Sequence, residues 1–359
     1  ARCPGIRREC ACPDPENIRV RRPDAGDSCV GGSYHSVFRC HGSTQSLRVR
    51  KESKETGAPG PWAREALRNE ISYLDSIPEA ARNYLPVLLL SWDEKTTGYE
   101  IPYYEDRPDL ARLVLEGGLG ADDAKEVQRQ LTEAVLIGLH SAEQVDGAPF
   151  CAHLEEVLTE SIEALAGDPH FHQVVEAESL VLNGQTLPGL RASHARLRAS
   201  GILHHLAQQS SVRLHGDLLL ENILWSPLLL IDPVSVTGLV MGHPLFDLVK
   251  HESYACGELY AIREELVTAC ELSKGTYSLE IPWGIDALRP FGQIDLTTEF
   301  RNDYIRLHGE IDPHHYQLID AYFSLVMARN TTGVHRFARV LKGCQCLARV
   351  GEEDLNDPL

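Results

Sequence analysis

The sequence predicts an α+β fold of two lobes, a small β-rich N-terminal lobe followed by a larger, mainly helical C-terminal lobe. Strand-like segments recur before residue 104 with one amphipathic helix among them, whereas the chain becomes helical after Arg107-Pro108. The 359 residues suffice for more than one core, and 43% hydrophobic residues are typical of a globular protein. We expect a leader over 1–28, an N-terminal lobe over 29–104 and a C-terminal lobe over 105–359.

The N-terminal lobe is expected to contain a hairpin of two strands, a third strand, a helix and two further strands. Glycines followed by β-branched and aromatic residues over 30–39 predict the start of this pattern, and alternation predicts a strand over 46–51. Residues 62–77 carry apolar side chains at helical spacing, and Pro78 ends that helix. Two more strands are predicted over 85–92 and 99–104, because a turn-prone segment separates them.

The C-terminal lobe is expected to be helical around one strand-and-turn region. Apolar residues at a spacing of four predict a helix over 123–142, and the patterns of 153–166 and 192–208 predict two more. Residues 210–236 are typical of short strands and turns. After this region we expect a mostly helical stretch that reaches about residue 350.

Charge and apolar runs exclude two classes of partner. The chain has 34 Lys and Arg against 52 Asp and Glu, a formal net charge of −18. Nucleic acids and anionic membranes would therefore be repelled at long range. The longest apolar run, 218–233, is interrupted by three polar residues, so it does not span a membrane. No apolar run follows the first residues, and the ten cysteines are too few for a disulfide scaffold, so we expect a cytoplasmic protein with reduced thiols.

Three polar residues stand out in the strand-and-turn region. Asp217, Asn222 and Asp232 are embedded in a strongly apolar sequence, where a buried carboxylate needs a compensating partner. Two carboxylates and an amide offer the hard oxygen ligands that suit Mg²⁺. Because Asp217 precedes Asn222 by five residues, a loop can direct the first at a substrate hydroxyl and the second at a metal. Asp232 ends a short apolar strand and can hold the same metal from the other side.

This pattern resembles a known family. His215-x-Asp217, with Asn222 and then Ile231-Asp232, is similar to the catalytic loop and metal-binding Asp of the aminoglycoside phosphotransferases, distant relatives of protein kinases. Protein kinases place Arg where this chain has Gly216, and they continue the metal-binding Asp with Phe-Gly rather than with a proline. The resemblance implies a protein-kinase-like fold and transfer of the γ-phosphate of ATP or GTP to a small-molecule hydroxyl, with Mg²⁺.

The resemblance extends over most of residues 28–260 and implies a nucleotide site in the N-terminal lobe. A glycine-rich turn lies where the family has its phosphate-covering loop, although an ordinary hairpin would explain it as well. Lys51 would hold the phosphates, with Arg50 as the alternative, and Glu70 would pair with that cation, with Glu65 as the alternative. The turn consists of Gly31, Gly32 and Ser33, and the connector whose backbone would bind the purine includes Pro102, Tyr103 and Tyr104.

In the C-terminal lobe the resemblance implies catalysis and acceptor binding. Asp217 would orient the acceptor hydroxyl and accept its proton, while Asn222 and Asp232 would bind Mg²⁺. His215 and Asp247 are expected to support the loop structurally. The histidine pairs 204–205 and 314–315 have no Cys or carboxylate at ligand spacing, so we expect ordinary surface or core roles for them.

The acceptor is less constrained than the reaction. Acidic residues beyond the loop, Glu299 and Asp303 among them, would suit a polycationic sugar such as an aminoglycoside, in a resistance or self-protection role. Acidic helix faces also serve solubility, and a neutral sugar-containing antibiotic or a biosynthetic metabolite remains an alternative. A catalytically inactive binding protein is a further alternative. A protein-substrate kinase is disfavoured because no Ala-Pro-Glu motif follows Asp232.

Overall fold

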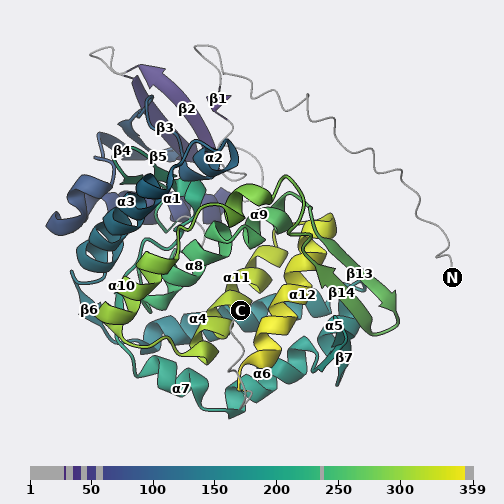
Figure 1. Ribbon diagram of the computed structural model, residues 1–359. Helices are drawn as coiled ribbons and strands as arrows, with labels where there is room; N and C mark the ends of the chain where they lie inside the picture. The colour runs from purple at the N-terminus through teal and green to yellow at the C-terminus, as the bar shows by residue number, and fades with distance from the viewer. Residues whose placement is uncertain (1–27, 30–34, 42–46, 54–59, 235–237, 352–359) are drawn as a thin grey trace.

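The computed structural model describes residues 28–29, 35–41, 47–53, 60–234 and 238–351. The N-terminal lobe is a five-stranded antiparallel sheet with the order β1-β2-β3-β5-β4, and helix α1 packs on it (Figure 1). The strands are β1 (Ser28–Cys29), β2 (His35–His41), β3 (Leu47–Ser53), β4 (Leu90–Asp93) and β5 (Thr97–Pro102), and the helix is α1 (Gly60–Asp75). The expected leader, apart from Ser28, and the glycine-rich turn at 31–33 lie outside the described residues.

A small core joins α1 to the sheet. Leu67 and Leu74 of the helix are buried against Tyr99 and Ile101 of β5, so the predicted apolar face of the helix is the one that packs. The predicted strand over 85–92 is wrong in its first half, since β4 begins only at Leu90. Leu85 is buried in the core, but Val87, Leu89 and Leu90 are 59%, 43% and 51% exposed, and β4 is an edge strand with one neighbour.

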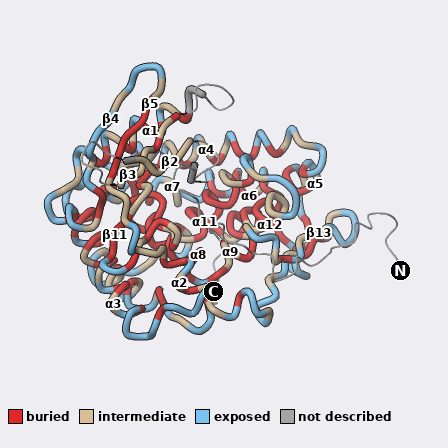
Figure 2. Tube along the Cα trace, turned by 90° about the horizontal axis from the view of Figure 1, so that it is seen from above, coloured by how far each residue is buried: buried red, intermediate tan, exposed pale blue. Residues whose placement is uncertain are grey.

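The C-terminal lobe is built from helices around one large core, with buried residues inside and exposed ones on the rim (Figure 2). The predicted helix over 123–142 is α3 (Ala121–Leu131), continued by a π-helical segment, η3 (Thr132–Leu139). The other helices are α2 (Leu110–Leu115), α4 (Ala148–Ala166), α5 (His172–Glu176), α6 (Leu190–Ala199), α7 (Ile202–Ala207), α8 (Leu245–Ala255), α9 (Glu258–Arg263), α10 (Thr298–His308), α11 (Pro313–Ala328) and α12 (Gly333–Arg349). Short 3₁₀ helices lie at Glu79–Tyr84, Leu220–Asn222 and Arg289–Gly292.

Short strands interrupt these helices. The strand-and-turn region contains β9 (Ser211–Arg213) and the hairpin of β10 (Ile223–Leu224) with β11 (Leu229–Leu230). β9 lies between β12 (Met241–Gly242) and β6 (Gln144–Val145) in a three-stranded sheet. This sheet leads the chain to His215, which is separated from the end of β9 by one residue.

The stretch after residue 250 is less helical than expected. A hairpin of β13 (Thr268–Ser273) and β14 (Thr276–Glu280) forms a four-stranded sheet with β7 (Leu180–Leu182) and β8 (Gln185–Leu187). Its turn is Lys274-Gly275, with Gly275 at φ +73°, where glycine avoids the cost of a Cβ. The alternating residues on either side of that glycine were the missed signal.

The predicted two-lobed α+β fold is confirmed by this architecture. Within the described residues, no helix combines the length and the apolarity needed to cross a membrane.

Candidate active site

The loop after β9 is held by one buried carboxylate. Asp247 of α8 accepts hydrogen bonds from the backbone amides of His215 (2.9 Å) and Gly216 (2.8 Å), and it lies 3.1 Å from Nε2 of His140. Burial raises the pKa of Asp247, but His140 and the Gly216 amide lower it more, so the net shift is below its ordinary value. Gly216 has φ +82°, and a Cβ there would lie 3.3 Å from Val234. The loop therefore requires glycine at this position.

Asp217 and Asn222 lie together at the end of this loop. Nδ2 of Asn222 donates to Oδ2 of Asp217 at 3.0 Å and to the Asp217 carbonyl at 2.9 Å. The second carboxylate oxygen, Oδ1, is 3.1 Å from Nζ of Lys250, a residue of α8 that sequence reasoning missed. Both side chains of this ion pair are nearly buried, at 6% and 7% exposed. The loop thus presents a carboxylate fixed by an amide and an ammonium group.

His215 lies beneath the loop. Its ring is buried, and Nδ1 lies 3.4 Å from the Asp217 amide as an acceptor. Burial lowers the pKa of His215, which favours the neutral ring. This geometry suits structural support better than proton transfer.

Asp232 and Lys51 connect the two lobes. Nζ of Lys51 on β3 lies 2.7 Å from Oε1 of Glu70 on α1 and 3.2 Å from Oδ1 of Asp232. Burial lowers the pKa of Lys51, but the charges of Asp232 and Glu70 outweigh it and hold the pKa well above its ordinary value. Lys51 is therefore a buried cation between two carboxylates. Asp232 has φ +53°, a left-handed conformation that Asp tolerates better than most residues.

The two alternative clamp residues have other partners. Arg50 is on the opposite face of β3, where its Nη2 lies 2.7 Å from Oε1 of Glu100, and Arg48 pairs with the same carboxylate. Glu65 is exposed and pairs with Arg68 of its own helix. Of the predicted residues, Lys51 and Glu70 are the ones that lie beside Asp232.

The connector after β5 already uses two of its backbone groups. The Tyr103 amide donates to the Leu47 carbonyl at 3.1 Å, and the Tyr104 carbonyl accepts from Arg107 at 3.3 Å. A purine would therefore have to use other groups of the segment that begins at Pro102.

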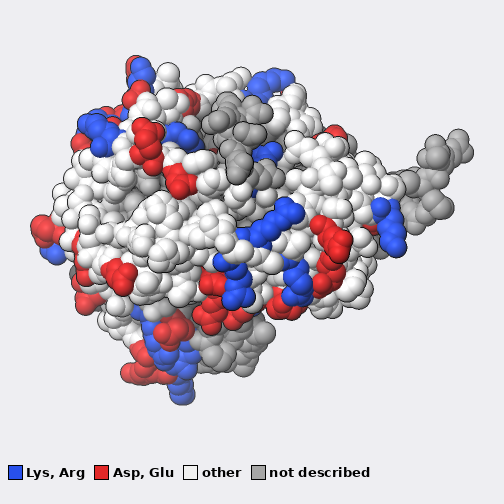
Figure 3. Space-filling model, turned by 90° about the horizontal axis from the view of Figure 1, so that it is seen from below, with Lys and Arg blue, Asp and Glu red and all other residues white. Residues whose placement is uncertain are grey.

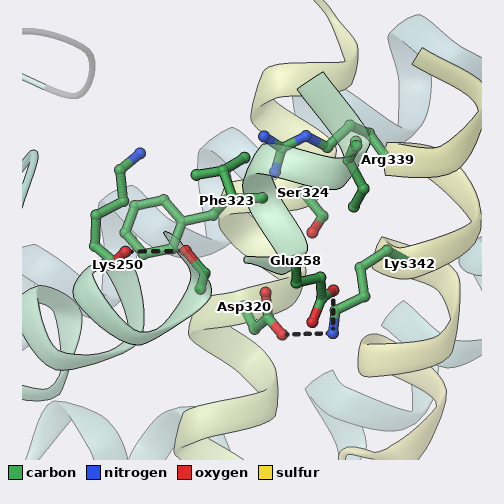
Figure 4. Close-up of a pocket in the computed structure, with 10 residues that line it drawn as sticks. Lys250, Glu258, Asp320, Phe323, Ser324, Arg339 and Lys342 are labelled. Atoms are coloured by element: carbon green, nitrogen blue, oxygen red, sulfur yellow. Dashed lines mark hydrogen bonds and ion pairs between the residues drawn. The ribbon is translucent and has the colours of Figure 1, made fainter. Parts of the chain in front are cut away.

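A cavity of about 1080 Å³ opens between α8, α10, α11 and α12. A smaller pocket adjoins it and includes Lys250, the partner of Asp217 (Figure 4). The two share Ser253, Glu258, Asp320 and Lys342. Nζ of Lys342 bridges the carboxylates of Glu258 and Asp320, at 2.7 and 3.2 Å. Lys250 lines the smaller pocket and not the large cavity, so the smaller pocket lies between the large cavity and the partner of Asp217.

The predicted acceptor residues lie elsewhere on α10. Asp303 accepts a hydrogen bond from Thr132 at 2.8 Å and pairs with Arg306 at 2.6 Å, so it joins α10 to η3. Among the described residues, the cavity lining from the start of α10 is Thr297, Thr298, Arg301 and Asn302, and it includes neither Glu299 nor Asp303.

Comparison with known proteins identifies the family. The model of the phosphotransferase enzyme family matches residues 29–268, well over half of the sequence. The chain belongs to the phosphotransferase enzyme family. This confirms the resemblance carried by the loop from His215 to Asp232. The phosphotransferase matches no curated protein.

Among solved structures, the phosphotransferase is similar to a fructosamine-3-kinase candidate from Thermobifida fusca, with 15% identity, a TM-score of 0.49 and coverage of 90% of this chain and 93% of that one. It is also similar to a choline kinase from Cryptosporidium parvum (11% identity, TM-score 0.40) and to the amicoumacin kinase hAmiN in complex with AMP-PNP, Ca²⁺ and Ami (11% identity, TM-score 0.43). Each of these two alignments covers 89% of this chain and 86% of the other. We base no assignment on these distant likenesses.

Proposed function

We propose that this phosphotransferase moves the γ-phosphate of ATP or GTP to a hydroxyl group of a small sugar-containing molecule, with aminoglycosides and other sugar-containing antibiotics as the first candidates. The observation that carries the proposal is the meeting of Lys51 and Glu70 of the N-terminal lobe with Asp232 of the C-terminal lobe. Phosphoryl transfer depends on positioning and charge stabilisation, and these three charged side chains can contribute to both.

The donor set beside Asp217 fits Mg²⁺. Asn222 turns its Nδ2 toward Asp217, which leaves the amide oxygen of Asn222 as a ligand. The Asp232 side chain is 42% exposed and adds a carboxylate. Hard oxygen ligands that leave room for water and phosphate oxygens are those that Mg²⁺ prefers. Bound there, Mg²⁺ would supply positive charge against the triphosphate.

The side chains have separate tasks in the proposed reaction. Lys51 binds the nucleotide phosphates, and Glu70 holds Lys51 in place. Asp217 orients the acceptor hydroxyl and takes its proton as the new O–P bond forms and the bond from the γ-phosphorus to the nucleoside diphosphate breaks. Lys250 and Asn222 fix the Asp217 carboxylate by its two oxygens.

The large cavity is proposed to receive the acceptor. Its lining contains three carboxylates (Glu252, Glu258 and Asp320) and three cations (Arg301, Lys342 and Arg349), so its charge is balanced. Glu252 is held by Arg301 and by the Tyr316 hydroxyl. Such a lining offers many hydrogen bonds with little net charge, which suits a polyhydroxylated molecule. On the face shown in Figure 3, acidic and basic side chains are likewise interspersed.

The test is a panel of aminoglycosides, other sugar-containing antibiotics and free sugars, each incubated with ATP or GTP and Mg²⁺. Mass spectrometry of the acceptor should show a gain of one phosphate for at least one member. Asp217→Asn should bind nucleotide with the parent affinity and yield no product. Phosphorylation of free sugars alone would favour a biosynthetic kinase, and nucleotide binding without product from any acceptor would favour a binding protein. Since both nucleotides are cytoplasmic, we expect the enzyme to act in the cytoplasm.

A further inference from the structure

Two histidines that are distant in the sequence, one from each of the pairs 204–205 and 314–315, meet in the C-terminal lobe. His205 of α7 and His315 of α11 stack with ring centroids 5.2 Å apart and an interplanar angle of 29°. Asp312, just before α11, lies beside both: its Oδ2 is 3.8 Å from Nδ1 of His205 and 3.7 Å from Nδ1 of His315. The ligand atoms of all three residues lie within 4.8 Å of one another. A carboxylate therefore lies beside one histidine of each pair, although the sequence showed none at ligand spacing.

We propose that His205, Asp312 and His315 bind a divalent transition metal ion, for which Zn²⁺ is the natural probe. In a tetrahedral site with metal–ligand bonds near 2.1 Å, two ligand atoms lie about 3.4 Å apart. The observed oxygen–nitrogen distances of 3.7 and 3.8 Å exceed this by a few tenths of an ångström. Two imidazole rings bound to one metal ion at the tetrahedral angle have their centroids about 5.2 Å apart. The centroids of His205 and His315 are separated by the same distance, 5.2 Å.

The carboxylate of Asp312 is prepared for this role by its second oxygen. Oδ1 caps α11, because it accepts from the amides of His314 (2.8 Å) and His315 (3.3 Å). That cap fixes the side chain and leaves Oδ2 directed at the two imidazoles. The distances from Oδ2 to both rings are too long for hydrogen bonds, so the three groups meet without bonding one another directly.

The two imidazoles differ in their exposure to solvent. His315 is buried, and burial lowers its pKa, which favours the neutral form that binds metals. His205 has a side chain that is 62% exposed, so an ion can enter from solvent. The neighbouring His243 cannot complete the set, since its Nε2 bonds Gln209 and its Nδ1 accepts from the Leu245 amide. The fourth position would be taken by water, as in three-ligand zinc sites.

The site would be separate from the phosphotransfer centre. Figure 1 places α7 at the edge of the molecule opposite the five-stranded sheet. A metal there would link α7 to the start of α11 and would stabilise the C-terminal lobe without contacting nucleotide. Metal binding at this site therefore does not depend on the proposed reaction.

The test uses the full-length protein after treatment with a chelator. Zn²⁺ is titrated by calorimetry without nucleotide, and Co²⁺ is titrated as a spectroscopic probe of tetrahedral coordination. We expect the parent to bind with micromolar or tighter affinity and its unfolding midpoint to rise by a few degrees with Zn²⁺. His205→Ala should weaken binding by about tenfold or more and should abolish the midpoint shift.

Each ligand has a neighbour that serves as a matched control. His204→Ala and His314→Ala remove the adjacent histidines, which are outside the cluster, and both should bind Zn²⁺ like the parent. His205 is exposed, so its replacement should not impair folding, whereas the buried His315 is a secondary test. Binding that is unchanged in His205→Ala, weakened equally in His204→Ala, or absent in the parent would overturn the proposal. Cys10 and Cys12 lie outside the described residues, and cysteines can also bind Zn²⁺. The decisive quantity is therefore the difference in Zn²⁺ affinity between the parent and His205→Ala.

Discussion

Replacement of Asp247 by Asn should release the catalytic loop while changing almost no volume. The carboxylate uses Oδ1 for the Gly216 amide and Oδ2 for the His215 amide and His140. An Asn has one acceptor oxygen, and at its best it keeps the two contacts of Oδ2. Its NH₂ group then faces the Gly216 amide, so two donors oppose each other in a fully buried position.

The cost follows from these contacts. A buried amide without an acceptor costs about 1–3 kcal/mol, and two remaining hydrogen bonds lose the strength that the charge gave them, roughly 0.5–1 kcal/mol each. We therefore expect a loss of about 3 kcal/mol, concentrated in the loop. Because 1.4 kcal/mol corresponds to about a tenfold change, opening of the loop should become roughly a hundredfold more frequent.

Hydrogen exchange measures this directly and needs no acceptor. Exchange of the Gly216 amide, followed by mass spectrometry of the peptide around residue 216, should accelerate by about two orders of magnitude, and the unfolding midpoint should fall. Asp122→Asn, which changes an exposed carboxylate in the first turn of α3, is the matched control and should leave exchange of the Gly216 amide at the parent rate. Exchange at Gly216 that matched the parent rate in Asp247→Asn would refute the reasoning.

Three further predictions concern the clamp, the catalytic carboxylate and pH. Lys51→Met should lower nucleotide affinity in calorimetry by about tenfold or more, because a charge-assisted phosphate contact is lost. Arg50, whose partner is Glu100, is the control, and Arg50→Met should bind nucleotide with nearly the parent affinity. A larger loss of affinity in Arg50→Met than in Lys51→Met would assign the phosphate contact to Arg50. Lys250→Met should reduce the rate of phosphate transfer by about tenfold or more at unchanged nucleotide affinity, and Lys250→Arg should recover part of that rate. An unchanged rate in Lys250→Met would show that Lys250 has no role in the reaction. Burial lowers the pKa of His308 to about 4. Between pH 6.5 and pH 4 this histidine is therefore protonated in the unfolded chain but neutral in the folded protein. Its contribution should lower the free energy of unfolding by up to about 1.4 kcal/mol for each pH unit that the pH falls. Urea titrations across that range should show a shallower decline in His308→Gln, and equal slopes would contradict the assignment.

The sequence alone could single out this loop because its polar residues lie close together in the chain. Asp217, Asn222 and Asp232 stand out as polar residues in apolar surroundings, and a single loop followed by a strand determines where they lie. The partnership of Lys51 with Glu70 was predicted only through family resemblance, because strand alternation could not exclude Arg50 as the clamp. The structure separates the two through the opposite face of β3, where Glu100 binds Arg50.

Long-range contacts account for what the sequence did not predict. Lys250 has the pattern of any helical lysine until α8 brings it to Asp217. His205 and His315 meet only because α7 packs beside the start of α11. The hairpin over 268–280 was missed because its alternating strands are only six and five residues long and lie between helices. For Asp303, acidity alone could not distinguish an acceptor ligand from a residue that joins two helices.

Helix α8 fixes the position of the loop beside it through side chains spaced along one face. Asp247, Lys250 and Tyr254 follow one another at intervals of three and four residues along one face of the helix. They meet, in the same order, the Gly216 amide, the Asp217 carboxylate and the Glu221 carboxylate. A single residue inserted between Lys250 and Tyr254 would rotate the two parts of this face relative to each other by about 100°, so the three attachments could not all form together. Anyone grafting this loop onto another scaffold would therefore have to carry the helix with it.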